Sequence, residues 1–128
     1  MKFFMPFFLV GTGGFMGSIL RYLMTFLFQD FYRFPLGTLI SNLAGCFLIG
    51  IVTALSFDIP LLSGETRLLL ATGVCGGFTT LSSFIYELGQ YLKDGEYAVG
   101  SLYFLGTFAG SALTFFLGIV LIRLLIKG

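Results

Sequence analysis

Four long apolar segments, separated by short polar connections, dominate the sequence. They cover residues 3–28, 36–57, 68–92 and 97–126. A helix needs about 20 predominantly apolar residues to cross the hydrocarbon core of a bilayer, and each segment meets that length. Only 10% of the residues are charged, against about 25% in a typical soluble domain. The sequence therefore predicts an all-α integral membrane protein, a single four-helix domain over residues 1–128, placed in the cell (inner) membrane.

The charged residues and the metal-binding residue types exclude several functions. The net charge is +1 and no basic run is present, so we expect no nucleic-acid partner. The sequence has no histidine and no Cys-x-x-Cys pair, which removes the usual zinc, haem and histidine-based catalytic sites. No nucleophile–base pair is evident, so an enzyme is not predicted. Cys46 and Cys75 lie in apolar segments, and we expect small buried packing residues, with a redox or metal role as the alternative.

The third apolar segment contains a stretch that does not suit a regular helix. Residues 73–84 include three glycines and four hydroxyl side chains. Glycine weakens a helix by about 1 kcal/mol relative to alanine, and hydroxyl side chains compete for backbone hydrogen bonds. Non-helical backbone persists at membrane depth only where protein buries it or where it lines a watery cavity. We therefore expect the third helix to be broken in mid-membrane, with carbonyl and hydroxyl groups exposed inside the protein.

The distribution of basic residues gives almost no orientation signal. With both termini and the second connection on one side, that side has four basic residues and the other has three. Such a balance predicts that either orientation inserts with similar ease, which allows one gene to supply an antiparallel homodimer. A single topology fixed by the weak bias remains the alternative. The first side holds Lys2, Arg67, Arg123 and Lys127, and the second holds Arg33, Lys93 and Arg21.

Polar side chains within the spans are the candidate functional residues, because they are costly to bury in a membrane. Asn42, in the second segment, either joins two helices or offers its amide N–H groups to a pathway without adding charge. Arg21 either extends to the membrane interface or contacts an anion. Glu87 is the only carboxylate inside a span. Three roles are open for Glu87: a proton relay, a vestibule group or a satisfied hydrogen-bond acceptor.

The fourth segment carries a regular series of hydroxyl side chains. Tyr103, Thr107 and Ser111 recur every four residues and therefore lie on one helix face. They form either a pathway for an anion or a set of hydroxyls bonded to their own helix. Phe84 follows the expected helix break, and the edge of its ring is electropositive. Such an edge can approach an anion without the fixed charge that would hold it, as conduction requires.

These motifs together resemble the Fluc/CrcB fluoride channel family over essentially the whole chain. The resemblance rests on residues 13–22, on Gly37-Thr38-Leu39 with Asn42 and Gly45, and on residues 73–84. It implies an antiparallel dual-topology homodimer with two fluoride pores, exporting fluoride passively. It also implies a structural sodium ion (Na⁺) at the dimer axis, held by the main-chain carbonyls of Gly76 and Thr79. The implied pore is lined by Asn42, Leu81, Ser82, Phe84, Tyr103, Thr107 and Ser111, with Arg21 and Glu87 as vestibule residues or as further candidates whose place stays open.

One departure from the family pattern concerns the expected aromatic residues. The family has Thr-Thr-Phe-Ser-Thr-Phe, whereas this chain reads Thr79-Thr80-Leu81-Ser82-Ser83-Phe84. Leu81 keeps the bulk of the first phenylalanine but loses its electropositive ring edge. We expect the fold and the sodium site to be kept. Either fluoride conduction is slower, or only the shape of the side chain matters at this position.

Three other functions are alternatives to a fluoride channel. A small multidrug exporter also has four helices, but it needs a carboxylate in its first helix, and this first segment has none. A proton-coupled anion exchanger would use Glu87 as its coupling group. A purely structural membrane subunit does not need a broken helix with polar side chains.

Overall fold

The computed structural model describes residues 2–29, 34–58 and 60–128, and all of its regular elements are helical. The third span is built from several short elements. The elements are α1 (Met5–Leu27), α2 (Leu36–Thr53), the π-helical η1 (Ala54–Asp58), α3 (Gly64–Arg67), the π-helical η2 (Leu68–Cys75), α4 (Gly76–Phe78), α5 (Leu81–Lys93) and α6 (Tyr97–Lys127).

Within the described residues, four helical runs are long and apolar enough to cross a membrane, as the hydropathy of the sequence predicts. They are Met5–Leu27, Leu36–Asp58, Gly64–Lys93 and Tyr97–Ile126. The third run begins at Gly64 rather than at residue 68. The last residues of the polar connection between the second and third predicted segments are therefore helical. Ser63 explains the earlier start, since its Oγ accepts a hydrogen bond from Thr66 N at 3.1 Å. A serine in this position caps the first turn of a helix.

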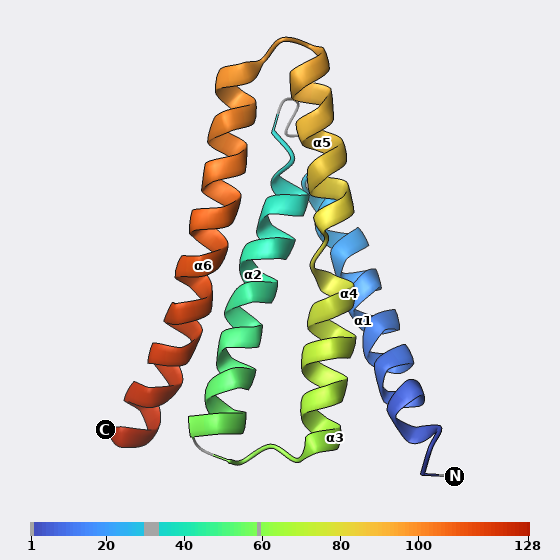
Figure 1. Cartoon of the computed structure of the whole chain (residues 1–128), viewed down its shortest axis with the longest axis vertical. Coiled ribbons are helices and arrows are strands. Elements are labelled where there is room, and N and C mark those ends of the chain that lie inside the picture. Colours follow the sequence, from blue (N-terminus) through green and yellow to red (C-terminus); the bar gives the residue numbers. More distant parts are fainter. Residues whose placement is uncertain (1, 30–33, 59) are drawn as a thin grey trace.

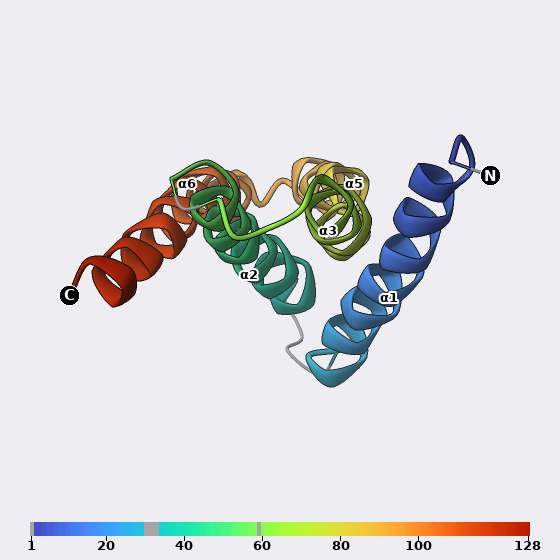
Figure 2. The same cartoon turned by 90° about the horizontal axis from the view of Figure 1, so that it is seen from below.

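The spans form two helix pairs that lie side by side. α6 packs mainly on α2, and α1 packs mainly on the third span at η2 and α4. Figures 1 and 2 show α1 and α6 on the outer sides, with α2 and the third span between them. Both chain termini and the α2–α3 connection lie at one end of the molecule, and the turn between α5 and α6 lies at the other (Figure 1). The count of four basic residues on one side against three on the other assumes the same arrangement of ends.

Close backbone contact between α1 and the third span depends on glycine. A Cβ atom built on Gly17 would lie 2.1 Å from Val74 O, and one built on Gly13 would lie 2.5 Å from Leu69 O. Real side chains do not reach such distances, so both positions need glycine for the helices to pack as they do. Gly11, on the same helix, has nothing within 4 Å of the corresponding position.

Gly17→Ala is therefore expected to destabilise the protein, whereas Gly11→Ala is not. Overpacking a close contact costs about 1–3 kcal/mol, and the obstacle at Gly17 is backbone that cannot turn aside. At Gly11 the same substitution gains helix propensity of about 1 kcal/mol. Thermal unfolding of the two variants in the same detergent measures the difference. Equal midpoints would contradict the packing of α1 described above.

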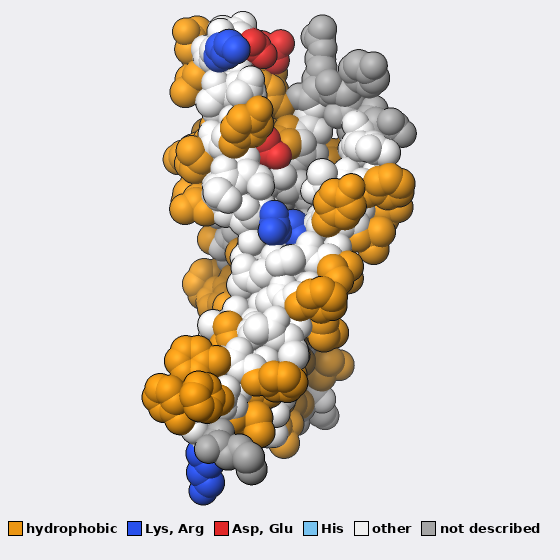
Figure 3. Space-filling model, turned by 90° about the vertical axis from the view of Figure 1, so that its right-hand side faces the viewer, with side chains coloured by type: hydrophobic (Ala, Val, Ile, Leu, Met, Phe, Trp, Pro, Cys, Tyr) orange, Lys and Arg blue, Asp and Glu red, His pale blue; other side chains and the backbone are white. Residues whose placement is uncertain are grey.

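The outer surface is mainly apolar. Large side chains along α1 and α6 are strongly exposed, among them Phe8 at 67%, Phe15 at 68% and Leu125 at 69%. In the face formed by α1 and the third span, hydrophobic side chains lie along the edges, with a band of backbone and other side chains between them (Figure 3). Lipid or a second protein chain must cover such a surface.

Candidate functional site

The third span changes conformation at Thr79 and Thr80. α4 ends at Phe78, and Thr79 has φ −83° and ψ 156°. Thr80 has φ −150° and ψ 119°, so both threonines are extended before α5 begins at Leu81. Thr80 caps α5, because its Oγ1 accepts from Ser83 N at 3.2 Å. The glycines and hydroxyls that marked this stretch in the sequence therefore surround a two-residue extended segment.

Asn42 of α2 holds this extended segment through both ends of its amide. Thr80 N donates to Asn42 Oδ1 at 2.8 Å, and Asn42 Nδ2 donates to Thr80 O at 3.2 Å. The side chain thus replaces the backbone partners that a helix would supply. An amide NH₂ group has two N–H donors, so one remains for another acceptor. Asn42 therefore joins two spans, which is one of the two roles considered for it, and its role in an ion pathway stays a prediction.

Two backbone carbonyls at this segment lose their helical donors. In a continuous α-helix, the N–H of residue i+4 donates to the carbonyl of residue i. Thr80 N donates instead to Asn42, which frees the carbonyl of Gly76. Ser83 N donates instead to Thr80 Oγ1, which frees the carbonyl of Thr79. These are the two carbonyls that the family resemblance assigns to a sodium ion, and oxygen atoms are the ligands that hard cations prefer.

Arg21 reaches the same part of the third span from α1. Its Nε donates to Gly77 O at 3.1 Å, and Gly77 lies in the last turn before the extended segment. A positive charge is favourable at the C-terminal end of a helix, where carbonyl groups lack donors. Arg21 therefore contacts backbone at mid-span, and its predicted place in a vestibule stays a prediction.

A pocket lies beside the extended segment, between α2, α5 and α6. Its volume is about 220 Å³. It brings together most of the side chains that the sequence predicts for a pore, together with a cysteine that was predicted to be a packing residue. The lining residues are Asn42, Cys46, Thr79, Thr80, Leu81, Phe84, Thr107, Phe108 and Ser111. Two predicted pore residues, Ser82 and Tyr103, are not among them.

Phe84 is the central aromatic side chain of this region. It is 1% exposed, and its ring centroid lies 5.0 Å from that of Tyr103 and 5.8 Å from that of Phe108. The contact with Phe108 is edge-to-face, the arrangement in which an electropositive ring edge meets an electronegative face. Phe108 was not predicted to take part, although it follows Thr107 directly in the sequence. Leu81, in contrast, is 66% exposed at the start of α5.

Two buried hydroxyl groups have no hydrogen-bond partner within the part of the chain that the structure describes. They are Thr107 Oγ1 and Ser41 Oγ, in residues that are 5% and 0% exposed. A buried polar group without a partner costs about 1–3 kcal/mol, so each hydroxyl is suited to an additional ligand or water. Thr107 lines the pocket. Ser41 was missed, although its place directly before Asn42 in an apolar span was a usable signal.

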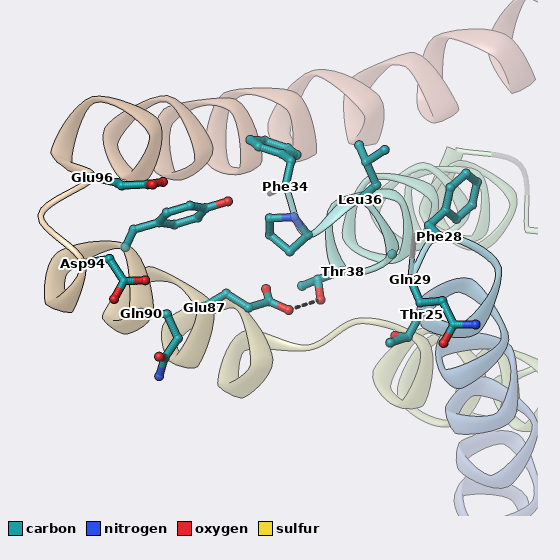
Figure 4. Close-up of a pocket in the computed structure, with 13 residues that line it drawn as sticks. Thr25, Phe28, Gln29, Phe34, Leu36, Thr38, Glu87, Gln90, Asp94 and Glu96 are labelled. Carbon is teal, nitrogen blue, oxygen red and sulfur yellow. Dashed lines mark hydrogen bonds between the residues drawn. The ribbon is translucent and has the colours of Figure 1, made fainter. Parts of the chain in front are cut away.

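Glu87 points into the protein and accepts two short hydrogen bonds. Thr38 Oγ1 donates to Glu87 Oε1 at 2.7 Å, and Tyr103 OH donates to Glu87 Oε2 at 2.6 Å. Figure 4 shows Glu87 directed from α5 toward Thr38 on α2. Glu87 and Thr38 line a second pocket of about 390 Å³, which Asp94 and Glu96 also line. The hydroxyl series on α6 therefore splits, since Tyr103 binds Glu87 whereas Thr107 and Ser111 line the first pocket.

Comparison with known proteins identifies the family. The family model described as CrcB-like protein, Camphor Resistance (CrcB), matches residues 8–119. The chain belongs to the CrcB family. One CrcB relative, the fluoride-specific ion channel FluC of Prosthecochloris aestuarii, is 49% identical over 116 residues, which cover 90% of this chain and 91% of the relative. Another, the FluC of Chlorobium phaeobacteroides strain BS1, is 50% identical over 117 residues, covering 91% of both chains.

A third relative matches a shorter part of the chain. The FluC of Leptospira interrogans is 48% identical over 99 residues, covering 76% of this chain and 78% of the relative. With its four apolar spans, this CrcB chain is a multi-pass cell membrane protein. The names of these relatives denote ion channels, which are not an enzyme class.

Proposed function

We propose that this protein is a fluoride-selective channel that lets fluoride leave the cell passively and so relieves fluoride toxicity. The pocket beside the extended segment is the observation that carries the proposal. Asn42, Thr107 and Phe84 all line this pocket, and the buried hydroxyl of Thr107 has no hydrogen-bond partner among the described residues. None of these groups carries a charge. The relatives named above as fluoride-specific channels support the choice of ion.

Neutral donors suit the passage of a small, strongly hydrated anion. An ion must bind well enough to leave its water and weakly enough to move on. Amide and hydroxyl donors replace lost water hydrogen bonds, and an aromatic ring edge adds a weak attraction to an anion. A lysine or arginine in the same place would hold the ion more tightly. The pocket therefore combines affinity with release.

The freed carbonyls of Gly76 and Thr79 are proposed to hold a structural sodium ion. The donor set fits, because both are neutral oxygen atoms and the hydrogen bonds of Thr80 N and Ser83 N go elsewhere. A bound cation would fix the extended segment by occupying carbonyls that a helix would otherwise use. Thermal unfolding with sodium replaced by a bulky organic cation tests this. An unchanged unfolding midpoint would count against the site.

An antiparallel homodimer with two pores is the proposed assembly, and the broken helix is proposed to lie at mid-depth in the bilayer. The charge balance between the two ends supports dual topology, although Arg33 and the side chain of Lys127 lie outside the described residues. The strongly exposed apolar side chains of α1 and α6 support contact with a second copy as well as with lipid. Light scattering of the purified protein in detergent gives the mass, and a monomer would contradict the dimer.

A channel and a proton-coupled exchanger differ in the force that drives fluoride release. Liposomes are loaded with fluoride at the same pH inside and outside, and a potassium ionophore sets the voltage. A channel releases fluoride as soon as the ionophore is added. A proton-coupled exchanger, with Glu87 as its coupling group, releases it only when a proton gradient is imposed. Release that needs the proton gradient would replace the channel by the exchanger.

Leu81→Phe is expected to raise the initial rate of fluoride efflux. The substitution restores a ring edge at a position that lines the pocket. An aromatic contact is worth about 0.5–1.5 kcal/mol, which predicts an increase of about two- to tenfold. Leu81→Met, which has similar bulk and no ring, is the matched control. Equal rates in the two variants would show that the ring edge at this position does not matter.

A further inference from the structure

One of the two cysteines lines the pocket beside the extended segment, whereas the other is buried away from it. Cys46 follows Asn42 by one helical turn on α2, so both side chains are directed to the same face, and both line the pocket. Cys46 is partly exposed, and Cys75 is 4% exposed. Cys75 is not among the described residues that line this pocket. The chain has no other cysteine, so its two thiols differ only in their surroundings.

Polar side chains contribute to the lining of the pocket around Cys46. Thr107 is 5% exposed and lines the pocket, and its buried hydroxyl has no partner among the described residues. Asn42 has an N–H donor left after its bond to Thr80. A water molecule occupies about 30 Å³ in the liquid, so a volume of about 220 Å³ admits water and small solutes. The pocket gives small thiol-reactive molecules access to Cys46, whereas burial protects Cys75.

From this placement we propose that Cys46 is a covalent modification site inside the ion pathway, open to small neutral thiol-reactive molecules. The proposal rests on the proposed function, since it places the modified thiol where fluoride passes. With methyl methanethiosulfonate, the Cys46 thiolate attacks the sulfenyl sulfur of the reagent. A new S–S bond to the methylthio group forms, methanesulfinate leaves with the bonding electron pair, and the thiol proton goes to water.

The added methylthio group closes the pathway. It extends from Cys46 into a pocket lined by Asn42, Phe84 and Thr107, and it fills space that water and fluoride would use. The group is apolar and donates no hydrogen bond, so it does not replace the contacts that an anion needs. Modification is therefore expected to reduce fluoride efflux by about tenfold or more, because conduction requires an unobstructed series of favourable sites.

The first part of the test is labelling, which needs no flux. Reconstituted full-length protein is treated with methyl methanethiosulfonate, and peptide mass spectrometry follows the adduct at each cysteine with time. We expect Cys46 to react about tenfold faster than Cys75 or more, since burial protects a thiol. Equal rates, or faster reaction at Cys75, would overturn the proposal. This outcome is independent of whether the protein conducts fluoride.

The second part of the test compares fluoride efflux before and after labelling, each variant being measured against its own unlabelled rate. Wild type and Cys75→Ser are expected to lose efflux on labelling, whereas Cys46→Ser and Cys46→Ala are expected to keep their rates. A complete adduct on Cys46 with unchanged efflux would overturn the proposal, because the pocket would then lie off the pathway. An absence of efflux in unlabelled wild type would instead refute the proposed function, with the labelling ratio still deciding whether Cys46 is the accessible thiol.

Discussion

Asn42→Ala is expected to abolish fluoride efflux, with a fall of about a hundredfold or more. The substitution removes both hydrogen bonds to Thr80 and the donor that faces the pocket. Leaving a buried donor or acceptor without a partner costs about 1–3 kcal/mol for each group. Two such groups in Thr80 supply enough free energy for a rate loss of this size, since about 1.4 kcal/mol corresponds to a factor of ten. Initial efflux from liposomes measures it.

Thr53→Val is the matched control in the same helix. Thr53 Oγ1 donates to Ile49 O, one turn earlier, at 2.7 Å, and Thr53 does not line the pocket. Removing its hydroxyl leaves a backbone carbonyl that still belongs to its helix, so we expect efflux close to wild type. Both proteins are checked for a single symmetrical peak in size-exclusion chromatography. Asn42→Ala with wild-type efflux would contradict the role assigned to the amide.

Glu87→Ala is expected to destabilise the protein by about 2 kcal/mol or more in free energy of unfolding. Thr38 and Tyr103 both donate to the carboxylate, and they are 5% and 0% exposed. The alanine variant leaves two buried hydroxyls without their acceptor, at about 1–3 kcal/mol each. Charge-assisted O–H···O⁻ bonds of 2.6–2.7 Å are also stronger than neutral ones. Thermal or denaturant unfolding in detergent measures the loss.

Glu87→Gln separates the hydrogen bonds from the charge. Its amide oxygen still accepts from one hydroxyl, and the other hydroxyl can rotate to accept from the amide N–H. We therefore expect a smaller loss of stability than in Glu87→Ala. Equal stability of Glu87→Ala and wild type would show that the two hydroxyls find other partners. A glutamine variant as unstable as the alanine variant would assign the stabilisation to charge rather than to hydrogen bonding.

The spans and several pocket residues follow from local sequence patterns. Hydropathy alone locates the four helices, because a bilayer sets the length of an apolar run. The four-residue spacing of Thr107 and Ser111 places both on the pocket side of α6, as a helix requires. The concentration of glycine and hydroxyl residues in the third segment marks the place where Thr79 and Thr80 are extended.

Contacts between helices could not be predicted in the same way. The pairing of Asn42 with Thr80 and that of Thr38 with Glu87 depend on the register between α2 and α5, which no local pattern specifies. The same register decides that Cys46 lines a pocket rather than filling space in a core. The first of these contacts also leaves the carbonyl of Gly76 without its helical donor.

The most direct measurement of the central claim is paired efflux of fluoride and chloride from the same preparation of proteoliposomes. Each batch is loaded with one anion, and a potassium ionophore sets the voltage. The structure predicts rapid loss of fluoride with chloride retained, because the pocket offers a few neutral donors at close range to a small anion. Equal loss of both anions, or loss of neither at verified reconstitution, would contradict a fluoride-selective channel.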